Sequence, residues 1–424
     1  MTAHVAGDAR APEGSPAPKP IAGPPTSLYV HVPFCVSLCP YCDFVVVAGV
    51  AARGPRNRIE AFVEALEAEM HLRADELDAR WGASRPPLET LYFGGGTPTL
   101  LPPAAIDRLL ATIGDRYGLA TDAEITIEAN PGPAERGDAS HLAESGVTRL
   151  SIGAQSFDPA ELRAIGRRHR PEDVATTVTA ARAAEIGSIS LDLLYDIPGG
   201  TLETWETTLD AALALEPDHL SLYALSLDDP DAEGLTSAGG DHLPTTRGAR
   251  RWRERARQAQ DDDRAAAMYE LADRRLAAAG YAWYEISNWA RPGHESRHNQ
   301  VYWQRAPYEA VGPGAHAFDG EARRWNAARL DAYVAALIPE PGRRPALPPG
   351  GSERIEPVAA DAERTILSLR TASGIAASDG ASPPLSTHLG WARAAALVEL
   401  TAADRFVLTT RGRLLSNELF ARLV

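Results

Sequence analysis

Short apolar segments alternate with longer amphipathic segments from residue 27 to about residue 227. The short segments are rich in β-branched and aromatic residues, and most lead into Gly, Pro or Asn, which is typical of strands that end in turns. The longer segments, such as 58–80 and 171–186, place apolar residues at helical spacing. The predicted strands are 27–33, 88–93, 124–129, 149–154, 189–194 and 219–225.

Six successive strand–helix units over residues 27–227 predict an α/β fold with a parallel sheet and helices outside it. Such a sheet is either open or curled into a partial (βα)6 TIM-like barrel. In these folds the active site lies at the carboxyl ends of the strands. The chemically active residue types of this chain follow those ends, at Cys35–Cys42, Gly94–Thr97, Glu128, Gln155 and Asp192.

Residues 228–340 predict an extension of this core. It begins with a loop-like insertion at 228–262, rich in Asp, Gly and Arg, and continues with a helix at 264–279 and a strand at 281–287. A Pro/Gly-rich stretch at 341–357 has the composition of a linker.

The last part of the chain, 358–424, predicts a small α+β domain that resembles a winged helix. Its expected elements are a helix near 361–371, a helix near 391–402 and a hairpin at 405–417. At the other end, residues 1–26 are rich in Ala, Gly and Pro and lack the charged start and apolar core of a signal peptide. We expect a disordered tail and a cytoplasmic protein.

Charge and hydropathy argue against two classes of function. The chain has 42 Lys and Arg against 57 Asp and Glu, a net charge of −15, whereas nucleic-acid binding depends on basic residues that neutralise phosphates. No apolar run approaches the roughly 18–20 residues of a membrane span, so an integral membrane protein is not expected.

The chain has three cysteines, Cys35, Cys39 and Cys42, in the spacing C-x3-C-x2-C after the first strand. Soft thiolates select zinc, copper(I) or iron–sulfur clusters. A structural zinc site needs a fourth ligand, and His31 is the nearest candidate, although it lies within a predicted strand. A four-iron cluster on three cysteines leaves one iron open to another ligand. Cluster, zinc site and buried free thiols all remain open at this point.

The C-x3-C-x2-C motif, with Tyr41 before its last cysteine, resembles the radical S-adenosylmethionine superfamily. The flanking YVHVPFC and CPYCDF resemble the branch that holds the oxygen-independent coproporphyrinogen oxidases and the heme chaperones. The resemblance spans about residues 27–330. It implies a [4Fe-4S] cluster on Cys35, Cys39 and Cys42, S-adenosylmethionine at the open iron, and an electron donor for the cluster.

The resemblance also assigns ligand residues. The glycine run in YFGGGTPT resembles the motif that receives the amino end of S-adenosylmethionine, although a lone glycine run is equally typical of a tight turn. Glu128 and Asp192 lie in strands that otherwise look buried, where a carboxylate needs a partner. A core ion pair would also satisfy them. The positions that the resemblance assigns to S-adenosylmethionine are Tyr29, Tyr41, Gly95, Gly96, Thr97, Glu128, Gln155, Arg167 and Asp192.

Two functions remain open within this branch. The oxidase pattern has a further cysteine two residues after the cluster motif, where this chain has Phe44. The H-N-x-x-Y-W motif formed by His298, Asn299, Tyr302 and Trp303 resembles the heme-binding motif of the chaperones. We expect a heme chaperone that passes heme to a membrane-associated hemoprotein acceptor. Radical decarboxylation of coproporphyrinogen III is the alternative.

Three histidines compete as the axial heme ligand. A neutral imidazole is a natural ligand for heme iron, and His294 and His316 are rivals of His298. A histidine beside Asn and aromatic residues is also typical of a hydrogen-bonded interface. The Arg-rich segment 247–257 is expected to be a solvated surface, with contacts to heme propionates or to an acidic partner as the alternative.

Overall fold

The computed structural model describes residues 23–48, 57–227 and 230–424, so most of the tail predicted at 1–26 lies outside the described residues. All six predicted strands form, and each is parallel to its neighbour in chain order. They are β1 (Ser27–Val32), β4 (Leu88–Gly95), β5 (Leu119–Ala129), β6 (Arg149–Gln155), β7 (Ser188–Tyr195) and β8 (His219–Ala224).

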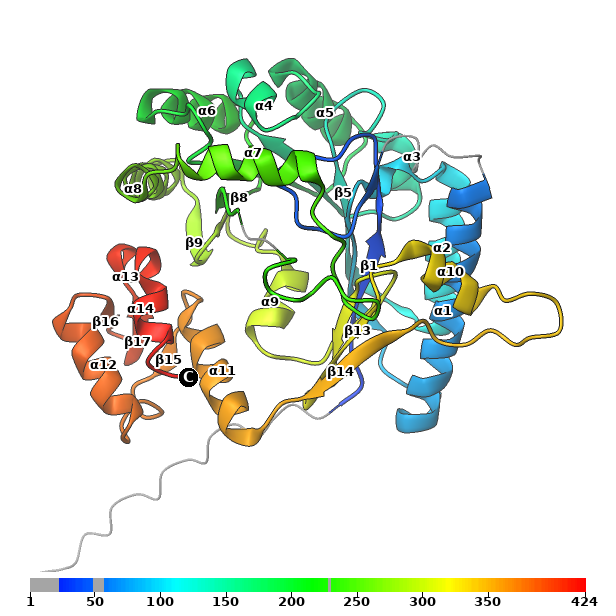
Figure 1. Ribbon diagram of the computed structural model, residues 1–424. Coiled ribbons are helices and arrows are strands. Elements are labelled where there is room, and N and C mark those ends of the chain that lie inside the picture. The colour runs from blue at the N-terminus through cyan, green and yellow to red at the C-terminus, as the bar shows by residue number, and fades with distance from the viewer. Residues whose placement is uncertain (1–22, 49–56, 228–229) are drawn as a thin grey trace, which may run out of the picture.

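Alternation along these strands separates two faces of a curved sheet. On β4, Leu91 and Phe93 are buried in the main apolar core, whereas Thr90 and Tyr92 point to the opposite, inner side. Helices cover the outer face (Figure 1). They are α1 (Asn57–Trp81), α2 (Pro103–Arg116), α3 (Ala139–Glu144), α4 (Pro159–Ala164), α5 (Pro171–Ala183) and α6 (Leu202–Ala214), with a short 3-10 turn η1 (Pro98–Leu100) after β4. The predicted partial barrel is therefore confirmed.

The extension adds strands at both edges of this sheet. β11 (Glu309–Val311) pairs in parallel with β1, while β10 (Asn288–Ala290) and β9 (Ala282–Glu285) follow β8 in antiparallel order. The strand predicted at 281–287 forms as β9, and β10 follows directly after the predicted range. α8 (Asp262–Ala278) precedes them, and α9 (Arg297–Trp303) lies inside the curve of the sheet (Figure 1).

Two segments predicted to be irregular contain regular structure. Residues Arg247–Arg257 of the predicted insertion form helix α7, so the expectation of a loop is wrong there. Within the predicted linker, β14 (Gly350–Arg354) pairs with β13 (Ala322–Asn326), which also pairs with β12 (His316–Phe318). Backbone pairing to a distant strand, not local composition, orders β14.

The terminal unit is a three-stranded sheet packed against helices, with an apolar core of its own. The predicted helix near 391–402 is wrong beyond residue 394, and the predicted hairpin at 405–417 is replaced by one at 398–408. Thr409 accepts a hydrogen bond from Gly412 N, which turns the chain into a helix after the second strand. The elements are α11 (Pro357–Leu369), β15 (Ile375–Ala376), α12 (Leu385–Ala394), β16 (Val398–Leu400), β17 (Arg405–Leu408), α13 (Thr410–Leu414) and α14 (Ser416–Phe420).

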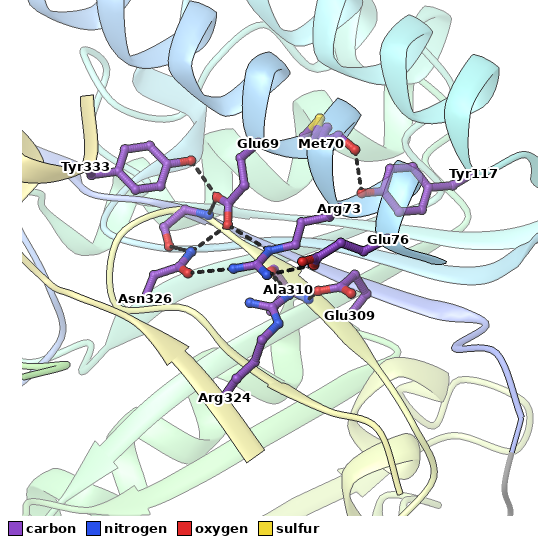
Figure 2. A network of polar contacts seen from close by, with 11 residues as sticks. Glu69, Met70, Arg73, Glu76, Tyr117, Glu309, Ala310, Arg324, Asn326 and Tyr333 are labelled. Atoms are coloured by element: carbon purple, nitrogen blue, oxygen red, sulfur yellow. Dashed lines mark hydrogen bonds and ion pairs between the residues drawn. The ribbon is translucent and has the colours of Figure 1, made fainter. Parts of the chain in front are cut away.

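A buried polar network joins α1 to the extension (Figure 2). The fully buried Glu69 of α1 accepts hydrogen bonds from Tyr333 Oη at 2.7 Å, Asn326 Nδ2 at 2.7 Å and Gly312 N at 2.8 Å. Tyr333 belongs to α10 (Leu330–Leu337). Arg73, one turn after Glu69, donates to Asn326 Oδ1 at 3.2 Å. The network therefore holds β11 and β13 against the core helix.

Within the described ranges, no helix combines the length and apolar character that a bilayer span requires.

Candidate functional site

A cavity of about 380 Å³ opens on the inner side of the sheet, where the parallel strands end. Most residues that the sequence assigned to a cluster or a ligand line it. These are Cys35, Cys39, Tyr41, Cys42, Gly95, Gly96, Glu128, Gln155, Arg167 and Asp192. Tyr29 and Thr97 lie just behind the cavity wall: Tyr29 Oη is 3.1 Å from His31 Nδ1, and Thr97 Oγ1 is 3.4 Å from Cys35 Sγ.

Cys35 ends β2 (Phe34–Cys35), and Cys39 and Cys42 lie on the loop that leads from it to β3 (Val47–Ala48), the cysteine loop; β2 and β3 pair in parallel. Cys42 N donates a hydrogen bond to Cys39 O at 3.1 Å, which tightens the loop around the last two thiols. Burial raises the pKa of Cys35 to about 12 and also raises the pKa of Cys42. At neutral pH these thiols are protonated in the metal-free protein, so metal binding there displaces protons.

His31, the candidate for the fourth ligand of a zinc site, is not directed to the thiols. His31 Nε2 is 2.8 Å from Val45 O and His31 Nδ1 is 3.1 Å from Tyr29 Oη, so both imidazole nitrogens are engaged away from the thiols. Burial lowers the pKa of His31 to about 4, which keeps it neutral. Among the described residues, no three His, Cys, Asp or Glu side chains converge on a point that would hold one metal ion. A four-iron cluster does not require that convergence, because each thiolate binds a different iron.

Two carboxylates face the cavity from neighbouring parts of the sheet. Glu128 accepts hydrogen bonds from Tyr92 Oη at 2.8 Å and from Gly95 N at 3.0 Å. Burial, and then the charge of Asp192, raise the pKa of Glu128 to about 7. Asp192 accepts from Ser151 Oγ at 3.0 Å, and burial raises its pKa as well. Two buried acids that repel each other favour a ligand with positive charge and hydrogen-bond donors, which fits the sulfonium and amino groups of S-adenosylmethionine.

Arg167 brings positive charge to the cavity wall. Arg167 Nη2 donates to Asn130 Oδ1 and to Gly153 O, both at 2.5 Å. Gln155 adopts a left-handed φ of 65°, a conformation that is uncommon for non-glycine residues. A Cβ at Gly153 would lie 2.9 Å from Gln155 Nε2 and 3.1 Å from Arg167 Nη2, so the ends of these two side chains would have to shift if residue 153 carried one. The wall suits the carboxylate end of an amino acid.

The backbone amides of residues 95–97, in the glycine loop, are hydrogen-bonded within the protein. Gly95 N donates to Glu128, Gly96 N donates to Val32 O at 2.9 Å, and Thr97 N donates to Phe34 O at 2.7 Å. These bonds hold the loop against β1 and β2. The close packing explains the glycines, because a Cβ at Gly96 would lie 2.6 Å from Phe34 O. The loop therefore shapes the cavity floor through its backbone path.

The H-N-x-x-Y-W residues lie outside this cavity, except for Asn299. His298 is 1% exposed; its Nδ1 is 2.8 Å from Thr90 Oγ1 and its Nε2 is 2.8 Å from Tyr302 Oη. Burial lowers the pKa of His298 to about 3. The Trp303 ring stacks under the Arg370 guanidinium at 4.4 Å. In this conformation the motif packs α9 into the barrel, and His298 has no ring nitrogen directed to an external ligand.

The two rival histidines are more accessible. The His294 side chain is 32% exposed, with Nδ1 at 3.2 Å from Ser188 Oγ. The His316 side chain is 40% exposed; its Nε2 is 2.8 Å from Asp241 Oδ2 and its ring stacks on Trp325. The structure does not bring either of them into the cavity that holds the cysteines.

Several residues that line the cavity were not predicted from the sequence, although most of them occupy alternating positions along the buried strands. Every second residue of the buried strands is polar, and these residues form the inner face. Tyr92, Arg149, Ser151, Ser190, His219 and Ser221 all line the cavity and follow this alternation. Asn130 follows β5 directly and donates to Thr97 Oγ1 at 2.8 Å. Its place after a strand end was the available signal.

Comparison with known proteins gives the family. The Radical SAM superfamily model matches residues 29–212. Heme chaperone HemW of Mycobacterium tuberculosis is 36% identical over 422 residues, which are 98% of this chain and 99% of that protein. Heme chaperone HemW of Bacillus subtilis is 31% identical over 406 residues, or 93% of this chain and 98% of that protein.

A solved structure confirms the fold. Coproporphyrinogen III oxidase (HemN) from Escherichia coli superposes with a TM-score of 0.74 at 24% identity, covering 95% of this chain and 90% of that one. The HemW relatives match the extension and the terminal unit as well as the core that carries the cysteines. The chain therefore belongs to the HemW family of the radical SAM superfamily.

Proposed function

We propose that the protein is a cytoplasmic heme chaperone that binds a [4Fe-4S] cluster, S-adenosylmethionine and heme and passes heme to an acceptor hemoprotein. The observation that carries the proposal is a cavity lined by three cysteines in a chain similar to heme chaperone HemW over 98% of its length. Phe44 supports it, because it lines the mouth of the cavity, 63% exposed, where the oxidase pattern has a further cysteine.

The cavity residues divide the binding work between them. Cys35, Cys39 and Cys42 would hold the cluster, which when bound supplies an electron to S-adenosylmethionine. Glu128 and Asp192 would accept hydrogen bonds and balance the positive charge of that ligand, and the Arg167 wall would face its carboxylate. The electron must come from a separate donor protein. In this proposal the cavity holds the cluster and S-adenosylmethionine, and heme binds elsewhere.

Heme would bind near residues 288–316, with the iron on one of three histidines. Coordination by His298, flanked by Tyr302 and Trp303, requires α9 to leave the interior of the barrel, because the imidazole is buried and doubly hydrogen-bonded. Coordination by His294 or His316 requires no such movement.

An anaerobic heme titration of the reconstituted protein, followed by absorbance, tests the proposal. Wild type should bind heme stoichiometrically, and one of the variants His294→Ala, His298→Ala and His316→Ala should lose most of that binding. Thr90→Val is the matched control, since it removes a hydrogen bond of His298 but keeps the imidazole. If His298→Ala and Thr90→Val weaken heme binding equally, the packing of α9 matters and His298 is not the ligand.

A wild type that binds no heme would overturn the proposal. The next assay is then conversion of coproporphyrinogen III with reductant and S-adenosylmethionine, detected by mass spectrometry. Metal analysis separates the zinc alternative, which predicts zinc without iron or sulfide.

A further inference from the structure

Most arginines of helix α7 are exposed, as the sequence predicts for a solvated surface, but one face of the helix is buried. Its buried residues are Ala249, Arg253 and Ala256, at positions i, i+4 and i+7 of one helix face. Arg253 is 3% exposed, whereas Arg251 and Arg255 on the same helix are exposed. An arginine is rarely buried unless its guanidinium has partners, so those partners define what the helix does.

Three of the groups that Arg253 contacts are backbone carbonyls of the cysteine loop. Arg253 Nε donates to Pro40 O at 3.1 Å, and Arg253 Nη2 donates to Cys42 O at 3.0 Å and to Tyr41 O at 3.3 Å. One guanidinium thus holds three consecutive carbonyl groups. Figure 1 shows α7 (green) beside the dark blue segment that carries the loop, although the two are more than 200 residues apart in the chain.

Independent contacts dock α7 at this place. Trp252 Nε1 donates to Ala164 O at 2.9 Å, and Ala256 packs into an apolar cluster that Tyr41 also contacts. The turn that follows α4 also packs on the loop, since a Cβ at Gly166 would lie 2.9 Å from Pro40 Cδ. The loop segment is therefore packed against both α7 and this turn.

We propose that Arg253 is a positioning residue for the cluster. Its guanidinium fixes the peptide groups of residues 40–42, so that the thiols of Cys39 and Cys42 keep their positions on the cavity wall, and it places a positive charge behind the loop. The inference deepens the proposed function and rests on it, since the cluster is part of that proposal.

Alkylation of the thiols in the metal-free protein tests the positioning without any cofactor. Arg253→Gln should speed alkylation of Cys39 and Cys42 about tenfold, because the loop opens more often once it has lost its hydrogen bonds to a charged group. Arg253→Lys should lie between the two rates, since one ammonium cannot span three carbonyls. Arg255→Gln, on the exposed face of α7, should match wild type. Alkylation rates that are the same in Arg253→Gln and Arg255→Gln would overturn the proposal.

The midpoint potential of the cluster in the reconstituted proteins separates the effect of the Arg253 charge from its effect on the position of the loop. Loss of the positive charge should make the midpoint potential of the cluster more negative in Arg253→Gln, while Arg253→Lys keeps a potential near that of wild type. Equal potentials in wild type and Arg253→Gln would remove the electrostatic part of the proposal. If wild type takes up no iron but Arg253→Gln is still alkylated faster, the cluster assignment fails and the positioning of the loop stands. Should Arg253→Gln fail to fold, Arg253→Lys carries the alkylation test alone.

Discussion

At the scale of single residues, the burial of Glu128 and the neighbouring charge should make the affinity for the proposed ligand depend on pH. The pKa of Glu128 is raised to about 7, so its carboxyl is largely neutral below that pH and attracts a cation weakly. We expect the affinity for S-adenosylmethionine to rise about tenfold between pH 6 and pH 8. Glu128→Gln should remove most of this dependence. Calorimetric titration across that range measures it, and a wild-type affinity that does not change with pH would contradict the assignment.

The raised pKa of Glu128 should also affect the stability of the protein when no ligand is bound. The folded protein keeps a proton that the unfolded chain, with a carboxyl pKa of 4.5, has already lost. The contribution of Glu128 to the free energy of unfolding is therefore present at acid pH and is lost as the pH rises from 4.5 to about 7. In Glu128→Gln, the free energy of unfolding measured by chemical denaturation should fall less between pH 4.5 and pH 7 than it does in wild type. Glu144→Gln, at an exposed position, is the control and should follow wild type.

Gly153 offers a test of geometry without a change of charge. Alanine there forces the ends of Gln155 and Arg167 to move, because its Cβ would lie within about 3 Å of both. We expect the affinity for S-adenosylmethionine to fall about tenfold, while the free energy of unfolding changes by less than about 1 kcal/mol. Gly114→Ala, where nothing lies within 4 Å of the added methyl, should leave the affinity unchanged. A large loss of stability in Gly153→Ala would show that the contact belongs to the core.

How far the sequence predicts a site residue depends on whether its signal is local. Glu128 and Asp192 stand out because a carboxylate within an apolar strand needs a partner. His298 is different, since its motif says nothing about Thr90, the residue 208 positions away that engages its Nδ1. Arg253 likewise looks like its exposed neighbours until the carbonyls of the cysteine loop are seen beside it.

At the scale of elements, α9 is held inside the barrel by a cap from β5. Glu124 accepts hydrogen bonds from Arg297 N at 3.1 Å and His298 N at 3.0 Å, at the positive end of the helix. Glu124→Ala should therefore destabilise the protein by about 1–2 kcal/mol and speed hydrogen exchange of the α9 amides. Glu144→Ala, at an exposed position of α3, is the control. Unchanged exchange in α9 would mean that packing alone holds the helix.

Elements were predicted well where their pattern is long and self-contained. The six parallel strands and the helices between them repeat one pattern, and tertiary pairing agrees with local preference. β14 and α7 were missed because their order depends on β13 and on the cysteine loop, respectively. At the chain end, the spacing that suggested a helix to residue 402 was overridden by pairing of Val398–Leu400 with β17.

At the scale of the whole molecule, the Glu69 network joins the core to the extension. Glu69→Gln removes one of the two carboxylates that pair with the buried Arg73, since Glu76 remains at 3.0 Å, and it removes the charged acceptor of the network. We expect a loss of about 1.5–3 kcal/mol in the free energy of unfolding. Tyr333→Phe removes one hydrogen bond and should cost about 1 kcal/mol. Glu64→Gln, on the exposed side of α1, should stay within about 0.5 kcal/mol of wild type.

The part of the molecule that Glu69→Gln destabilises tests the role of the network. Gly312 N donates to Glu69, and Gly312 packs so closely on β1 that a Cβ there would lie 2.4 Å from His31 O. His31 in turn bonds Val45 O at the end of the cysteine loop. Hydrogen exchange of Glu69→Gln should therefore rise in β11 and in the cysteine loop, while the terminal unit, which has its own apolar core, stays protected. An increase spread evenly over the chain would instead mean that Glu69 contributes only global stability.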